Sequence, residues 1–241
     1  LIAAGYKDIT LLGQNVNSYG RDHGELDFAG LLESIGELDG DFLIRFMTSH
    51  PKDATERLFE AMAGCKKIAR HLHLPFQAGN DRVLKEMNRG YTAESYLRLI
   101  ELARGMMPDL VLTSDVIVGF PGETDEEFED TLTMIKAVRF DSLFTFLYSP
   151  RKGTPAAEMP DPFGKEEKQR RFERLLELQN AISAQKHAAY VGKVERVLID
   201  GESDDPEYPL TSRTNGGRLV RLRGAGKERI GQFCDALVTS S

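Results

Sequence analysis

The sequence has few cysteines, no long apolar run and no excess of positive charge, and each shortage excludes a class of protein. Its 241 residues include 2 cysteines, Cys65 and Cys234, which lie far apart. They exclude a disulfide scaffold, and they cannot hold an iron–sulfur cluster by themselves. No apolar run approaches the roughly 18 residues that a membrane helix needs. The net charge of −7 argues against indiscriminate nucleic-acid binding but allows a local basic patch.

The first residues of the sequence have the pattern of a helix end. Leu1 to Gly5 resembles the tail of a helix with a glycine cap, and no methionine precedes it. We therefore expect the chain to be a fragment. No signal peptide is recognisable, so we expect a cytoplasmic protein that does not associate with membranes.

Up to Tyr148, short apolar runs alternate with amphipathic segments of helical spacing. We expect strands over residues 8–12, 42–47, 69–74, 110–118 and 140–148. We expect helices over residues 26–38, 54–64, 80–87, 93–106 and 124–138, the last with a capping box formed by Thr124 and Glu127. Strands that alternate with helices in this way indicate βαβ units and a parallel sheet, and five units fit a partial or full (β/α) barrel.

The pattern changes after Tyr148. A loop rich in proline and glycine leads to one long charged helix over 165–187, and short alternating strands follow. The expected fold class is therefore α/β, with a partial (β/α) barrel over 1–162, a connecting helix over 163–187 and a small antiparallel β-barrel over 188–241.

Polar residues stand where the predicted strands end, and in parallel barrels functional sites lie at that edge. Asp115 lies in an apolar strand, where an unpaired charge is costly, so we expect it to have a partner. His71 and His73 share a strand face. They could ligate a metal in a barrel hydrolase, but no further carboxylate and histidine set completes such a site, and packed, hydrogen-bonded histidines are the alternative that we favour.

Five motifs stand in a characteristic order. They are Leu-Gly-Gln-Asn-Val-Asn-Ser-Tyr (12–19), His-Leu-Pro-Phe-Gln (73–77), Met-Asn-Arg-Gly-Tyr-Thr (87–92), Ile-Val-Gly-Phe-Pro-Gly-Glu-Thr (117–124) and Tyr-Ser-Pro-Arg-Lys-Gly-Thr-Pro-Ala (148–156). Together they resemble the radical S-adenosylmethionine (SAM) methylthiotransferases along the whole chain. The first motif is similar to that of MiaB-type, tRNA-modifying members, whereas members that modify a ribosomal protein typically have Asp-Thr-Ser there. Residues 188–241 resemble a TRAM domain, a small RNA-binding β-barrel.

The resemblance implies a partial radical SAM barrel with a TRAM-like domain, and it implies roles for single residues. Its SAM-binding residues would be Gln77, Asp115, Thr48 and Ser49 toward the ribose or amino group, Arg89 toward the methionyl carboxylate, and Ile117 and Gly119 toward the adenine. A guanidinium suits a two-oxygen acceptor such as that carboxylate. Gln14, Asn15 and Arg151 would lie on the substrate side, and no catalytic residue is assigned.

The implied reaction adds a methylthio group to C2 of an N6-isopentenyladenosine beside the anticodon of tRNA. It implies SAM and two 4Fe-4S clusters as cofactors. The cluster motif Cys-x-x-x-Cys-x-x-Cys is absent from this chain, so we expect those ligands elsewhere and this fragment to be inactive alone. The expected partners are the tRNA anticodon stem-loop and an electron donor such as flavodoxin or ferredoxin.

A basic stretch near the C-terminus would hold the RNA backbone through Arg213, Arg218, Arg221 and Arg223. The acidic run 200–207 faces it, so a mixed solvated surface is the plainer interpretation. Two other functions stay open: a ribosomal-protein methylthiotransferase and a non-catalytic RNA-binding fragment.

Overall fold

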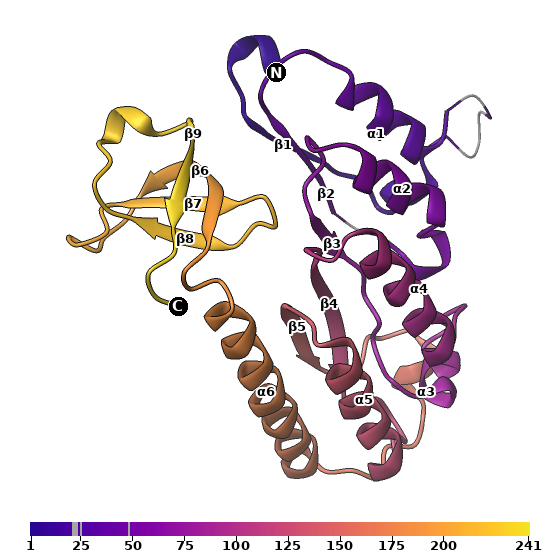
Figure 1. Cartoon of the computed structure of the whole chain (residues 1–241). Coiled ribbons are helices and arrows are strands. Elements are labelled where there is room, and N and C mark those ends of the chain that lie inside the picture. Colours follow the sequence, from indigo (N-terminus) through magenta and orange to yellow (C-terminus); the bar gives the residue numbers. More distant parts are fainter. Residues whose placement is uncertain (21–23, 25, 48) are drawn as a thin grey trace.

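The computed structural model describes residues 1–20, 24, 26–47 and 49–241, and its N-terminal part is built on five parallel strands (Figure 1). The strands are β1 (Asp8–Leu11), β2 (Leu43–Phe46), β3 (His71–His73), β4 (Val111–Val118) and β5 (Ser142–Leu147). β1 pairs with β2, β3 and β5 flank β4, and a parallel bridge between Ile44 and Ile68 connects the two groups. The strands therefore follow one another in chain order, which confirms the predicted βαβ units.

Helices cover one side of these strands (Figure 1). They are α1 (Phe28–Gly36), α2 (Glu56–Gly64), α3 (Asp81–Glu86), α4 (Ala93–Met106) and α5 (Asp125–Val138). Short 3₁₀ turns span Ile2–Ala4, Val16–Ser18, Pro51–Asp53, Pro155–Ala157 and Lys227–Arg229. The predicted capping box of α5 is confirmed, because Glu127 N donates to Thr124 Oγ1 and Thr124 N donates to the Glu127 carboxylate.

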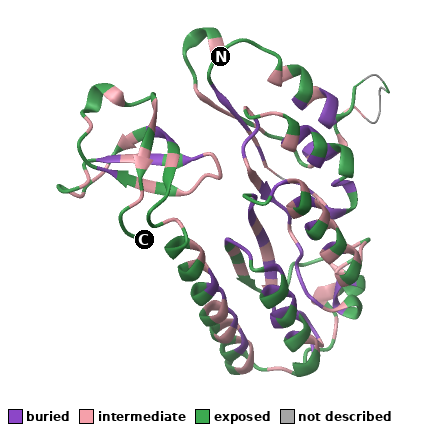
Figure 2. Cartoon of the chain, in the orientation of Figure 1, coloured by how far each residue is buried: buried purple, intermediate pink, exposed green. Residues whose placement is uncertain are grey.

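The two faces of β4 differ in burial (Figure 2). Leu112 and Val116 are fully buried and belong to the core that the strands share with the helices. Because side chains alternate along a strand, Thr113, Asp115 and Ile117 point to the other face, away from that core. The expected strand over 69–74 is shorter than predicted, but the chain beyond it stays beside β4, since Leu74 N and Gln77 N donate to carbonyls of that strand.

The long helix α6 (Lys165–Ala188) packs against β5 and α5 and leads to the C-terminal sheet. That sheet contains β6 (Val194–Glu202), β7 (Leu210–Thr214), β8 (Leu219–Leu222) and β9 (Phe233–Leu237), in the antiparallel order β8-β7-β6-β9. Val197, Ile199, Leu210 and Leu222 form its small apolar core. In the described ladders β8 and β9 are the two edges.

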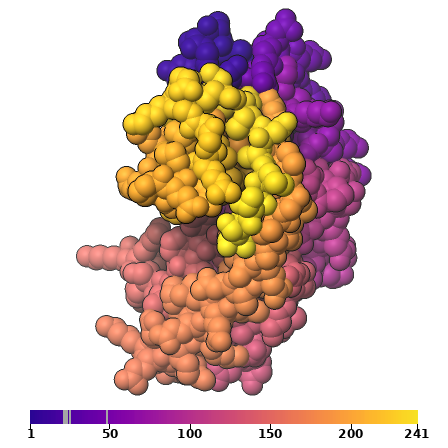
Figure 3. Space-filling model, turned by 60° about the vertical axis from the view of Figure 1, so that its left-hand side comes forward, coloured from indigo at the N-terminus to yellow at the C-terminus, as the bar shows by residue number. Residues whose placement is uncertain are grey.

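The turn between β7 and β8 fastens this sheet to the N-terminal part of the chain. Arg45 donates to the backbone oxygens of Thr214 and Asn215, and the Asn215 side chain accepts from Arg70 N. Arg218 donates to Asp141, the residue just before β5. These contacts lie on β2 and just before β3 and β5. Figure 3 shows the C-terminal sheet, in yellow and orange, resting against the indigo and purple N-terminal segments.

Candidate functional site

The carboxyl ends of β3 and β4 bring Gln77, Asp115 and Ile117 together. Gln77 N donates to Asp115 O over 2.9 Å, and Ile117 N donates to Gln77 O over 3.0 Å. Gln77 is 6% exposed and has a φ of 67°, a left-handed conformation that non-glycine residues rarely adopt. Strained backbone of this kind is typical of functional sites and here turns the chain sharply beside β4.

Arg89 carries an unpaired polar atom in this region. Its side chain is half-buried, and its Nε has no hydrogen-bond partner among the described residues. It lies near His50, whose pKa is lowered mainly by burial and further by the Arg89 charge. His50 in turn contacts Tyr91, with ring centroids 5.7 Å apart. A buried guanidinium N–H without a partner is costly, and a carboxylate ligand would satisfy it.

Gly119 ends β4 in a turn that a second buried group holds. Its φ is 74°, and a Cβ there would stand 2.8 Å from carbons of the Lys168 side chain, so any larger residue would be strained. Gly119 N donates to Glu123 Oε2 over 2.9 Å. Burial raises the pKa of Glu123 to about 7, against the opposing effects of that hydrogen bond and of Arg171. Arg171, fully buried in α6, lies 3.7 Å from the same carboxylate.

A polar cluster follows the ends of β1 and β2. Asn15 Nδ2 donates to Asp53, and Ser49 Oγ donates to Asn17 Oδ1 over 3.3 Å. Asn15 Oδ1 and Asn17 Nδ2 are buried and have no hydrogen-bond partner among the residues described. Two of the predicted site residues, Asn15 and Ser49, thus lie in one cluster with unsatisfied groups. A polar ligand could occupy those groups.

The other predicted substrate-side and ribose residues are placed differently. Gln14 is exposed in the loop after β1, and Arg151 is exposed in the loop after β5. Arg151 O accepts from the backbone and hydroxyl of Thr154, which orders that loop. Thr48 lies outside the described residues.

The two histidines of β3 bind a hydroxyl in this structure. His71 Nε2 and His73 Nδ1 both lie 3.0 Å from Thr113 Oγ1. Within the described ranges no group of three or more His, Cys, Asp or Glu side chains could hold a metal ion. The hydrolase alternative therefore lacks a third ligand in that part of the chain.

The cysteines do not form a cluster site. Cys65 follows α2 and Cys234 lies within β9, on opposite parts of the chain, and both are free thiols. Iron–sulfur clusters are held by several cysteine thiolates at one place. The chain shown here does not supply that ligand set.

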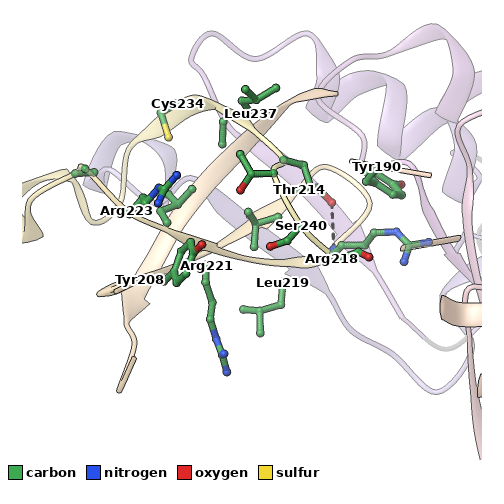
Figure 4. A pocket seen from close by; sticks show the side chains of 18 of the residues that line it. Tyr190, Tyr208, Thr214, Arg218, Leu219, Arg221, Arg223, Cys234, Leu237 and Ser240 are labelled. Atoms are coloured by element: carbon green, nitrogen blue, oxygen red, sulfur yellow. Dashed lines mark hydrogen bonds between the residues drawn. The ribbon is translucent and has the colours of Figure 1, made fainter. Parts of the chain in front are cut away.

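A cleft of about 820 Å³ opens between the edges of the C-terminal sheet (Figure 4). β8, β9, the end of α6 and the last residues of the chain line it. Tyr190 and Tyr208 give it aromatic surface, and Arg221 and Arg223 give it charge. Arg223 lies over the Tyr208 ring at 5.9 Å from its centroid. Cations interleaved with aromatic rings are the groups that bind the backbone and bases of single-stranded nucleic acids.

The four predicted RNA-binding arginines have different surroundings. Arg221 and Arg223 are 58% and 62% exposed and face Asp205 and Glu207 at 3.8 and 3.6 Å. Arg213 donates to Asp200 and does not line the cleft. Arg218 also lines the cleft, but it is only 11% exposed, and its guanidinium points toward the N-terminal part in Figure 4 and pairs with Asp141. Its position gives Arg218 a role in joining the two parts.

Residues that sequence reasoning passed over complete these sites. Thr113 and Glu123 contact predicted site residues or their neighbours, and Asp141 anchors the C-terminal sheet. The period-two spacing of Thr113 and Asp115 indicates that the two side chains share a strand face, and it could have identified Thr113 as a site residue. Nothing in the sequence around Asp141 indicates its partners, which come from residues 45 and 77 positions further along the chain.

The five consecutive parallel strands, with polar residues at their carboxyl ends and helices on one side, define a partial (β/α) barrel of the kind that radical SAM enzymes use. The Radical SAM superfamily model matches residues 1–135, and the TRAM domain model matches residues 188–241. The chain belongs to the radical SAM superfamily.

Curated relatives match nearly all of the chain. The tRNA-2-methylthio-N(6)-dimethylallyladenosine synthase of Clostridium botulinum (strain Loch Maree / Type A3) is 49% identical over 239 residues, which cover 99% of this chain and 53% of the relative. The protein of the same name from Carboxydothermus hydrogenoformans is 48% identical over 240 residues, which cover 99% and 54%. The chain thus spans about half the length of these curated relatives.

Solved structures show the same fold at low sequence identity. Coproporphyrinogen III oxidase (HemN) from Escherichia coli, described as a radical SAM enzyme, aligns with a TM-score of 0.52 and 19% identity, covering 66% of this chain and 37% of that one. TsrM from Kitasatospora setae, a radical SAM methyltransferase, aligns with a TM-score of 0.51 and 18% identity, covering 64% and 30%. Across the described part of the chain, no helix has the length and apolar character to cross a membrane.

Proposed function

We propose that this chain is the SAM-binding and RNA-binding portion of a tRNA methylthiotransferase that adds a methylthio group to C2 of N6-dimethylallyladenosine beside the anticodon. The observation that carries the proposal is the match over 99% of this chain, at 48–49% identity, to relatives that bear the name of that synthase. The grouping of Gln77, Asp115 and Ile117 at one strand edge supports it.

SAM fits the described residues. Gln77 and Asp115 would hold its ribose, Ser49 would lie toward the ribose or amino group, and Ile117 and Gly119 would line its adenine; the same role for Thr48 rests on the resemblance alone, since Thr48 lies outside the described residues. Arg89 would bind its carboxylate, which satisfies the unpaired Nε. Given one electron from the cluster expected in the whole protein, SAM would supply a radical that abstracts hydrogen, with methionine as the other product. The chain's own residues would orient the cofactor and the base and limit side reactions. Asn15, Gln14 and Arg151 would lie on the substrate side.

The 4Fe-4S clusters do not fit this chain, whose two cysteines lie on separate elements. We therefore assign no cluster ligand here. In the whole protein we expect two clusters, an electron donor such as flavodoxin or ferredoxin, and a cytoplasmic location where the tRNA anticodon stem-loop is available. Arg221 and Arg223, which line the open cleft, would hold the RNA backbone, and Arg213, which lies on β7 outside the cleft lining and pairs with Asp200, would add to their positive charge.

Mass spectrometry of tRNA from a strain that lacks the full-length gene tests the function. We expect the methylthio group on dimethylallyladenosine to be missing and to return with the wild-type gene. Normal tRNA together with an unmodified ribosomal protein would refute the proposal in favour of a ribosomal-protein methylthiotransferase.

The SAM site has its own test in the full-length protein. Arg89→Ala should weaken SAM binding about tenfold or more, because it removes a charge-assisted pair, while the thermal midpoint should change little. Arg98→Ala is a matched control, since Arg98 lies on α4 and pairs only with Glu94 in its own exposed helix turn among the interactions described. Equal SAM affinity in both variants, measured by calorimetry, would contradict the assignment.

A further inference from the structure

A line of polar side chains crosses the face of the strands that the helices leave uncovered. His71 and His73 come from β3, and Thr113 and Asp115 come from β4. His73 pairs with Thr113 in the ladder register, so these side chains share one face. Thr113 Oγ1 lies 3.0 Å from each imidazole, and His73 Nε2 lies 3.5 Å from Asp115 Oδ1. The four groups form one chain of contacts that ends at Asp115.

The chemistry of these four groups determines which of them donates and which accepts at each contact. A carboxylate oxygen accepts hydrogen bonds, and His73 Nε2 is the ring nitrogen that faces Asp115 Oδ1, so the N–H of the ring belongs on Nε2. His73 Nδ1 then accepts, and the Thr113 hydroxyl must donate to it. The oxygen of Thr113 is left to accept from His71 Nε2. Burial lowers the pKa of His71 to about 4, so this imidazole is neutral at physiological pH and has a proton to give from one nitrogen.

Packing holds His73 in this orientation. Its side chain is buried, and its ring meets the edge of Phe144 with centroids 5.7 Å apart. Asp115, by contrast, is 28% exposed on the strand face that it shares with Ile117, and its backbone oxygen accepts from Gln77 N. Packing therefore fixes the His73 end of this row of contacts, and the Asp115 end presents its carboxylate to the proposed cofactor site.

We propose that His73, itself held by Thr113, is a positioning residue that fixes the Asp115 carboxylate for the hydroxyl groups of the SAM ribose. The inference rests on the proposed SAM site and deepens it. A carboxylate free to rotate would lose much of the directionality that a vicinal diol requires, because each hydroxyl must meet one oxygen lone pair. His73 Nε2 lies 3.5 Å from Oδ1, on one side of the carboxylate, and leaves the remaining lone pairs for the ligand.

The test measures how much of the affinity for a ribose hydroxyl depends on His73. The full-length, cluster-loaded protein is titrated by calorimetry with S-adenosylhomocysteine and with its 2′-deoxy and 3′-deoxy analogues. In wild type, at least one deoxy analogue should bind about tenfold more weakly than the parent, as expected for a lost hydrogen bond to a charged group. In His73→Ala the parent ligand should weaken by about the same factor, while that deoxy analogue should change little.

Two further variants separate positioning from packing. His73→Gln keeps an amide donor near the position of Nε2 and should restore the preference for the intact ribose. Thr113→Val keeps the volume but removes the hydroxyl that orients His73, so the preference should fall as in His73→Ala. Equal weakening of all three ligands by His73→Ala, or an unchanged preference in both His73→Ala and Thr113→Val, would overturn the inference. If wild type binds none of the ligands, the SAM site fails first, and the inference fails with it.

Discussion

The ion pair between Arg218 and Asp141 offers the sharpest test of how the two parts of the chain are joined. The two side chains are 11% and 6% exposed. Removing one partner of a buried pair costs about 3–5 kcal/mol, because the other charge stays buried without compensation. Here Asp141 keeps Lys186, 3.0 Å away, and the N–H of Leu112 at 2.8 Å. We therefore expect Arg218→Ala to lower the free energy of unfolding by about 2–3 kcal/mol.

Arg221→Ala is the matched control, since it removes the same side chain three residues away. Arg221 is mostly exposed and faces Asp205 at 3.8 Å, so its loss should cost less than about 0.5 kcal/mol. Urea unfolding followed by circular dichroism gives both values, and hydrogen exchange at Asn215 and Gly217 reports release of the turn. The reverse should hold for RNA: Arg221→Ala weakens binding of an anticodon stem-loop. Equal stability losses in the two variants would refute this division of roles.

Two other perturbations test the electrostatics of the sites. Burial raises the pKa of Glu123 to about 7. The stability that this carboxyl contributes is therefore present below about pH 4.5 and is lost as the pH rises through 7. Relative to Glu123→Gln, the free energy of unfolding of the wild type should fall by about 3 kcal/mol between about pH 4 and about pH 8. A pH-independent difference in urea unfolding would contradict the burial of an ionisable carboxylate there. Asp205→Asn combined with Glu207→Gln removes the acids that face Arg221 and Arg223, so stem-loop affinity should rise severalfold and its dependence on salt should steepen. Identical salt slopes in fluorescence titrations would place the RNA elsewhere.

Much of the fold can be predicted because it depends on local periodicity. The helix over 93–106 was predicted from apolar spacing, and α4 has those bounds. The capping box of α5 follows from residues three apart. β3 was predicted too long, because its last apolar residues continue beside β4 through single hydrogen bonds without forming a regular ladder. Patterns that span a few residues are visible in a sequence, whereas the end of a ladder depends on the neighbouring strand.

For the candidate site, too, the residue types could be predicted from the sequence, whereas their partners could not. By itself the sequence determined which residue types stand at the strand ends, since Gln77, Asp115 and Gly119 each interrupt or end an apolar run. Only the tertiary structure decided their partners: the register of β3 against β4 set His73 beside Asp115, and the docking of the β7–β8 turn set Arg218 on Asp141. Arg218 and Arg221 are equivalent in a sequence of basic residues. They differ in the molecule because the energetic effect of a charge depends on its burial and its partners. The partner of Arg218 lies 77 positions away in the sequence, and that of Arg221 lies 16 positions away.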